Sequence, residues 1–191
     1  MASTPPGQRR LQILQALAAI LEQPKGEKIT TAALAGKLAV SEAALYRHFA
    51  SKAQMFEGLI EFIETSVFGL INQISDKHDD GVAQTRDIIG MLLNFASSNP
   101  GMTRVLIGDA LVNEDERLQL RMNQFYDRVE LALKQALRVA AAEGRGNETE
   151  VGVRAGMLVS FVVGRWHRYA KSGFKLNPAQ DAAQQIAMLL G

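Results

Sequence analysis

The 191-residue chain has no cysteine, three histidines and few aromatic residues, which make up 6% of it. Without thiols it can form no disulfide, no thiolate metal site and no nucleophilic cysteine, and this composition suits a reducing cytoplasm. No apolar run approaches the ~18 residues of a membrane span. The N-terminus, ASTPPGQRR, lacks the apolar stretch of a signal peptide. We therefore expect a soluble, cytoplasmic protein.

The motifs of common enzyme classes are missing as well. His48, His78 and His167 stand alone in the sequence, and none lies at metal-ligand spacing from another histidine or a carboxylate. There is no GxSxG motif, no glycine-rich phosphate loop and no dinucleotide fingerprint. Acidic clusters at 79–80 and 114–116 flank predicted helix starts, where carboxylates complement the helix dipole. We expect no enzymatic activity, no metal and no cofactor.

Charge is distributed unevenly along the chain. Residues 1–52 carry seven Lys or Arg and three Glu, a net charge of +4. Residues 53–191 carry fourteen basic and seventeen acidic side chains, a net charge of −3. A basic N-terminal part on an acidic body is typical of proteins that contact nucleic acid with that part.

Helical periodicity runs through the whole chain, and no stretch alternates with the period of a strand. The first helix is expected to bury Leu11, Leu14 and Leu17. Two motifs, Pro24-Lys25-Gly26 and Asn99-Pro100-Gly101, predict breaks, whereas Asn177-Pro178 predicts a helix start. The predicted helices span 8–22, two short segments within 30–50, then 51–74, 82–98, 102–110, 114–143, 150–171 and 178–190.

Residues 29–52, ITTAALAGKLAVSEAALYRHFASK, have the pattern of a helix-turn-helix. Thr30 or Thr31 can cap the first short helix, Ala39-Val40 turns the chain, and Ser41 can cap the second helix. The second helix offers short or hydrogen-bonding side chains that a DNA major groove can admit: Glu42, Ala43, Tyr46, Arg47 and His48. From spacing alone, an ordinary pair of core helices with polar outer faces is equally compatible.

The string Tyr46-x-His48-Phe49-x-Ser51-Lys52 resembles the TetR family of dimeric DNA-binding regulators. The resemblance implies an all-α fold with a helix-turn-helix head, residues 1–52, and a helical regulatory and dimerisation body, residues 53–191. It also implies that Thr30, Tyr46, His48 and Lys52 grip DNA phosphates. The complete predicted DNA-binding set is Thr30, Thr31, Ser41, Glu42, Ala43, Tyr46, Arg47, His48 and Lys52.

Two longer segments resemble one branch of that family, the nucleoid occlusion factors. They are SEAALYRHFASKAQMFEGLIEFIE (41–64) and NPGMTRVLIGDALVNEDERLQLRMNQFYDRVE (99–130), and the likeness runs from about Arg9 to Arg138. It implies binding of specific double-stranded chromosomal DNA and association with the nucleoid. It further implies antagonism of the tubulin-like division protein FtsZ, so that no septum forms over the chromosome.

Phe62 is the candidate anchor for that partner. On the predicted helix 51–74 the apolar stripe predicts a core face of Phe56, Leu59, Ile60, Ile63, Val67, Leu70, Ile71 and Ile74. Phe62 lies about 130° from the centre of this stripe, among small residues. Either it contacts a partner or another helix covers it. The resemblance favours partner contact, together with Asn99.

The predicted helix 150–171 is apolar over much of its circumference and is interrupted by Gly152, Gly156 and Gly164. Each glycine in a helix interior costs about 1 kcal/mol relative to alanine, so three of them suggest close approach of another backbone. We predict a homodimer formed by the last two helices, where the TetR resemblance also places it. A central helix in a monomer is the alternative.

Two other functions stay open at this point. A ligand-responsive TetR-type transcriptional repressor would need a cavity lined by residues such as Phe95, Met122, Phe125 and Trp166. A helical interaction protein without DNA affinity would leave the motif at 30–52 unexplained.

Overall fold

The computed structural model describes residues 6–23 and 29–191, and over these residues it is helical with no strand. The predicted all-α fold is confirmed, while the predicted break at Pro24-Lys25-Gly26 lies outside the described residues. The helices are α1 (Pro6–Leu21), α2 (Thr31–Lys37), α3 (Glu42–Tyr46), α4 (Lys52–Lys77), α5 (Gly81–Ser98), α6 (Pro100–Leu106), α7 (Glu116–Ala142), α8 (Val151–Lys171) and α9 (Ala182–Leu190), with short 3-10 turns η1 (Asp109–Leu111) and η2 (Glu148–Glu150).

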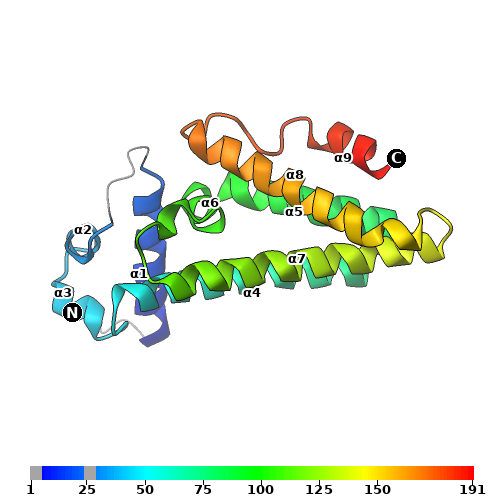
Figure 1. The fold of residues 1–191 in the computed structure, drawn as a ribbon. Helices are drawn as coiled ribbons and strands as arrows, with labels where there is room; N and C mark the ends of the chain where they lie inside the picture. The colour runs from blue at the N-terminus through cyan, green and yellow to red at the C-terminus, as the bar shows by residue number, and fades with distance from the viewer. Residues whose placement is uncertain (1–5, 24–28) are drawn as a thin grey trace.

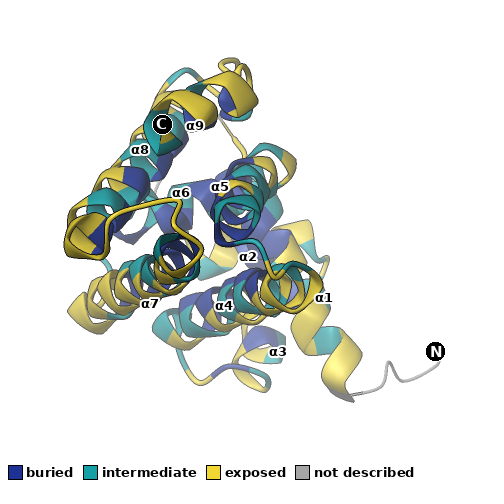
Figure 2. Cartoon of the chain, turned by 90° about the vertical axis from the view of Figure 1, so that its right-hand side faces the viewer, coloured by how far each residue is buried: buried dark blue, intermediate teal, exposed yellow. Residues whose placement is uncertain are grey.

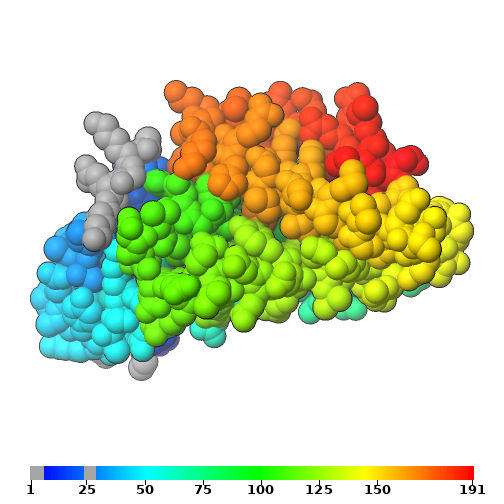
Figure 3. Space-filling model, in the orientation of Figure 1, coloured from blue at the N-terminus to red at the C-terminus, as the bar shows by residue number. Residues whose placement is uncertain are grey.

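Helices α1, α2 and α3 gather at one end of the molecule, which we call the head, and α4 runs from this end along α7 (Figure 1). Helix α5 lies in the middle of the body, where α4, α7, α8 and α9 pack against it (Figure 2). The space-filling view shows α7, α8 and α9 along one face of the body (Figure 3). The division at residue 52 stays a prediction; α4 begins there and continues into the body as one 26-residue helix.

The buried core follows the predicted helix faces with two corrections. Leu11, predicted as a core residue, is 39% exposed, whereas Ile13 is buried. Leu70 is 38% exposed although it belongs to the predicted core stripe of α4. Leu59, about three turns earlier on nearly the same side of α4, is fully buried. Exposure therefore depends on which helix covers each level of α4, and periodicity does not record this.

Helix α6 begins at Pro100, two residues before its predicted start, because the proline that breaks α5 also serves as the first residue of α6. Gly101 brings α6 against α1, since a Cβ at this position would lie 2.0 Å from the carbonyl oxygen of Ala18. Arg104 extends this contact by donating from Nη1 to the carbonyl oxygen of Gln23 at 3.1 Å. Helix α6 thus holds α1, and with it the head, against the body.

Helix α9 begins at Ala182, so its predicted start at Pro178 is wrong. The side chain of Asn177 caps only a turn, accepting from the backbone N–H of Ala179 at 2.9 Å. Arg165 on α8 stabilises this turn by donating to the carbonyl oxygens of Pro178, at 2.9 Å, and of Gln180. These carbonyls are held by a side chain 13 and 15 residues earlier in the chain, which is beyond the reach of local helix-start signals.

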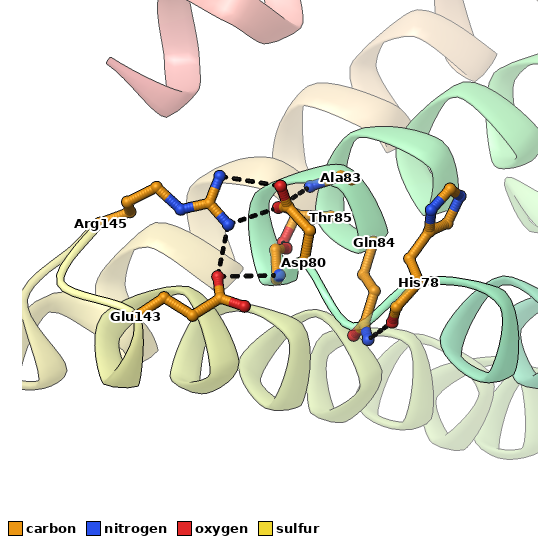
Figure 4. Close-up of polar contacts among 8 residues, drawn as sticks. His78, Asp80, Ala83, Gln84, Thr85, Glu143 and Arg145 are labelled. Carbon is orange, nitrogen blue, oxygen red and sulfur yellow. Dashed lines mark hydrogen bonds and ion pairs between the residues drawn. The ribbon is translucent and has the colours of Figure 1, made fainter.

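A polar cluster ties the α4–α5 turn to the end of α7, at the end of the body opposite the head (Figure 4). Asp80 caps α5 by accepting from the backbone N–H of Ala83 at 2.8 Å. Arg145 pairs with Asp80 at 2.7 Å, and Glu143 accepts from the backbone N–H of Gly81 at 3.3 Å. The Arg145 hydrogen bond, followed by the Ala83 N–H, lowers the pKa of Asp80 to about 2.

Within residues 6–23 and 29–191, no helix has the length and hydropathy that a bilayer crossing requires. The same part of the chain brings no three His, Asp or Glu side chains into a group that could hold a metal ion.

Candidate nucleic-acid interface

The two helices of the helix-turn-helix begin at side-chain caps. The hydroxyl of Thr30 accepts from the backbone N–H of Ala33 at 3.1 Å, which resolves the choice between Thr30 and Thr31. The hydroxyl of Ser41 accepts from the N–H of Ala44 at 3.3 Å, as predicted. Thr31 instead donates to the carboxylate of Glu42, which joins the start of α2 to the start of α3.

The turn between α2 and α3 depends on an unusual backbone conformation. Ala39 has φ 52°, in the left-handed region that favours glycine. Backbone bonds hold this turn, since the N–H of Ala39 donates to Gly36 at 3.1 Å and that of Val40 to Ala35 at 3.0 Å. The short link fixes the angle at which α3 leaves α2 (Figure 1).

Most of the predicted DNA-contacting residues on and just after α3 are exposed to solvent. Glu42, Ala43, Tyr46 and Arg47 are exposed, and Tyr46 has 45% of its surface accessible. Of the other predicted DNA contacts, Thr30 and Ser41 are exposed, whereas Thr31, His48 and Lys52 are half-buried. Leu45 on α3 is buried in the core, and so is Phe49, which lies three residues past the end of α3. The head therefore presents an exposed set around the start of α3.

Arg10 on α1, which is not among the predicted DNA-binding residues, supports this set. Its Nη1 donates to the carbonyl oxygen of His48 at 2.6 Å, and its guanidinium lies 4.2 Å from the centre of the Phe49 ring. Arg10 thereby holds the chain that leaves α3. The only local signal for it is the basic pair Arg9-Arg10, which identifies no partner.

Lys52 has a partner inside the protein. Its ammonium forms an ion pair with Glu114, which precedes α7, and the two side chains are 23% and 13% exposed. The hydroxyl of Ser51 caps α4 by accepting from the N–H of Gln54 at 3.2 Å. Lys52 is thus the first residue of α4, within the predicted helix 51–74. Its charge is already paired with that of Glu114.

The predicted partner residues lie on two helices that pack together, Phe62 on α4 and Asn99 at the end of α5. Phe62 is 39% exposed, so no helix of the described chain covers it completely. Asn99 ends α5 and is half-buried, with its amide donating to the carbonyl oxygen of Phe95 at 2.7 Å. Because α5 returns along α4 at about 1.5 Å per residue, its end comes back to the level of roughly residue 60 of α4.

Apolar surface is uncovered on α8 and α9. Val153 is 68% exposed, Met157 56% and Met188 78%. Val153, Met157 and Leu189 also line a hollow of about 260 Å³. A Cβ added at Gly152, Gly156 or Gly164 would meet nothing within 4 Å. We call this surface the α8–α9 face, and contacts among the described residues give no reason for its glycines.

Three of the four side chains that the predicted ligand cavity would need are buried, and Phe95 is half-buried. Met122, Phe125 and Trp166 are at most 1% exposed. The Phe125 ring lies 5.3 Å from that of Phe68, and the indole N–H of Trp166 donates to the carbonyl oxygen of Leu92 at 3.1 Å. These contacts lend no support to a ligand site at the predicted place.

Two protein families match the chain. Residues 13–59 match the family described as "Bacterial regulatory proteins, tetR family". Residues 79–191 match the SlmA-like family described as "Tetracyclin repressor-like, C-terminal domain".

Similar proteins extend over nearly the whole chain. The nucleoid occlusion factor SlmA of Shewanella pealeana is 48% identical over 186 residues, which cover 97% of this chain and 94% of that protein. The protein of the same name from a Marinomonas species is 48% identical over 183 residues, covering 95% and 92%. The predicted end of the likeness near Arg138 was therefore wrong, because the last helices match too.

Solved structures share the fold. A TetR transcription regulator from Haloarcula marismortui has a TM-score of 0.81 at 17% identity, covering 96% of this chain and 97% of that one. The regulator FadR of Bacillus subtilis, solved in complex with stearoyl-CoA, has a TM-score of 0.77 at 12% identity, covering 95% and 97%. At these identities the likeness concerns the fold alone.

Proposed function

We propose, from the premise that this chain belongs to the SlmA family of TetR-type nucleoid occlusion factors, that it binds specific chromosomal sites and antagonises FtsZ assembly there. The observation that carries this proposal is the 48% identity over 97% of the chain to a nucleoid occlusion factor. Membership places the chain among DNA-binding regulators rather than enzymes. Antagonism of FtsZ at such sites would block septum formation over the chromosome.

In this proposal, α3 enters the major groove with its N-terminal end. Glu42, Ala43 and Arg47 are exposed there and reach base edges, because small or hydrogen-bonding side chains fit the groove. Tyr46, His48 and Lys52 follow in the sequence and contact phosphates. The exposure of Tyr46 and the cap at Ser41 support this arrangement.

The protein acts as a homodimer through the α8–α9 face. Val153 and Met157 are more than half exposed in one subunit, and a second copy would remove them from water. Gly156 leaves room for another helix to approach closely. A dimer would present two heads to two half-sites of one DNA duplex, so each head adds affinity to the other.

FtsZ would bind the surface that includes Phe62 and Asn99. An exposed aromatic side chain on a long, rigid helix is a typical interaction anchor. Its position on α4 leaves both the head and the α8–α9 face free, so DNA and FtsZ can bind one dimer at the same time (Figure 1).

The test uses purified protein, FtsZ from the same organism and DNA selected by the protein from a random pool. With GTP, the DNA-bound protein should lower the amount of FtsZ polymer that sediments, and DNA without the selected site should have much less effect. Unchanged sedimentation with the DNA-bound protein would overturn the FtsZ part. Failure to enrich any sequence would overturn the DNA part.

A further inference from the structure

The ammonium of Lys52 is held back along α4. It pairs with Glu114, and it also lies 5.8 Å from the ring centre of Phe56, one turn further into the helix. A DNA phosphate would approach the N-terminal end of α4, where the first backbone N–H groups point outward. The ion pair therefore draws the charge of Lys52 away from the position that phosphate binding requires.

Glu114 depends on Lys52 for its charge compensation. Over residues 6–23 and 29–191, Lys52 is the only ion-pair partner of this carboxylate, whose side chain is 13% exposed. The next residue, Asp115, has other partners: it caps α7 at the N–H of Arg117, at 3.2 Å, and pairs with the Arg117 side chain at 3.5 Å. A poorly exposed carboxylate that loses its only cation is disfavoured.

We propose that Glu114 restrains the DNA affinity of the head, because Lys52 must leave this ion pair before it can bind a phosphate. The inference rests on the proposed phosphate contact of Lys52. The Glu114 carboxylate and a DNA phosphate then compete for the Lys52 ammonium. The phosphate contact of Lys52 therefore contributes less to DNA affinity than the same contact from an unpaired, solvated lysine would. Glu114 lies outside the helix-turn-helix, between η1 and α7, so this pair also links the body to the strength of DNA binding.

The exchange has a consequence for salt dependence. A lysine that neutralises a phosphate releases counterions from DNA, which makes the fall of affinity with salt steeper. Glu114 left without Lys52 attracts a cation, which opposes this release. Removal of the Glu114 charge should therefore raise the affinity and steepen the salt dependence together.

Glu114→Gln removes the charge and keeps the size of the side chain. Anisotropy titrations of selected DNA between 50 and 200 mM salt should show an affinity about two- to fivefold higher per head, the range for releasing an ion pair of this exposure. The slope of log affinity against log salt should steepen by up to about one unit per head. Lys52→Met should weaken binding to all DNA sequences, and in that background Glu114→Gln should have no effect.

Glu116→Gln is the matched control, because Glu116 is an exposed carboxylate two residues away with no part in the Lys52 pair. It should leave affinity unchanged. Glu114→Asp, which keeps the charge and lengthens the pair, should give a smaller rise and replaces the Gln variant if that one does not fold.

Four results would overturn the proposal. An equal rise with Glu116→Gln, or a rise with Glu114→Gln that persists without Lys52, would show general repulsion of DNA. A loss of affinity with Glu114→Gln would show that Glu114 orients Lys52 for DNA. Unchanged affinity and slope in Lys52→Met would mean that the underlying phosphate contact, rather than its restraint, is absent.

Discussion

Replacement of Phe62 by alanine separates the proposed FtsZ surface from the packing of the body. Phe62 is 39% exposed, so about 60% of it is buried. Complete burial of a phenylalanine side chain contributes about 1.5–3 kcal/mol, so the truncation should lower the free energy of unfolding by roughly 1–2 kcal/mol. Phe56 on the same helix is 0% exposed, and its truncation should cost about 3–5 kcal/mol because a cavity opens.

These differences in unfolding free energy correspond to shifts in melting temperature. For a chain of this length, 1 kcal/mol corresponds to about 2–4 °C, so Phe62→Ala should melt about 2–8 °C lower and Phe56→Ala about 6–20 °C lower. At a temperature where Phe62→Ala is fully folded, FtsZ sedimentation and DNA titration are then compared. We expect Phe62→Ala to lose FtsZ disruption, since an interface anchor contributes ~2 kcal/mol or more, and to keep its DNA affinity and dimeric state.

Two results would refute this reasoning. A Phe62→Ala protein that melts as low as Phe56→Ala would show that Phe62 belongs to the core. A stable Phe62→Ala protein that still disrupts FtsZ polymers would remove Phe62 from the partner surface.

Three further changes test the turn, the polar cluster and the dimer. Ala39→Gly should raise the melting temperature by about 2 °C, because relief of left-handed strain at φ 52° (about 1–2 kcal/mol) exceeds the added unfolded-chain entropy (about 0.5–1 kcal/mol); a lower melting temperature would contradict it. Asp80 has its pKa lowered to about 2 by Arg145, so its contribution to stability is complete above about pH 4 and is lost as the pH falls through about 2. The Asp80→Asn protein should therefore show a flatter dependence of melting temperature on pH between 4 and 2, and an unchanged dependence would argue against this role. Gly156→Leu should give folded monomers in sedimentation velocity, because a Cβ at this position would meet nothing within 4 Å inside the subunit; Gly69→Leu, where a Cβ on α4 would also meet nothing within 4 Å, should stay dimeric.

Features set by neighbours in sequence were predicted well. Helix α3 begins behind the predicted cap at Ser41. Helix α5 begins at Gly81, one residue before its predicted start, and α7 begins at Glu116, two residues after its predicted start. Their caps, Asp80 and Asp115, bond to backbone N–H groups two or three residues away. The long helices likewise follow from apolar periodicity, since each stripe must be buried against some other element. The helix-turn-helix was recognisable for the same reason, because its caps, turn and exposed residues occupy one continuous segment of 24 residues, 29–52.

By itself, the sequence determined the all-α fold, most helix positions and the family resemblance. The tertiary structure decided that Lys52 pairs with Glu114, 62 residues away, and that Arg10 binds the carbonyl of His48, 38 residues away. It also decided that Leu70 is exposed on a stripe whose other members are largely buried. Caps and periodicity act within one or two helical turns, so the sequence displays them directly. Ion pairs and exposure between distant segments depend on how whole helices pack, which no local pattern specifies.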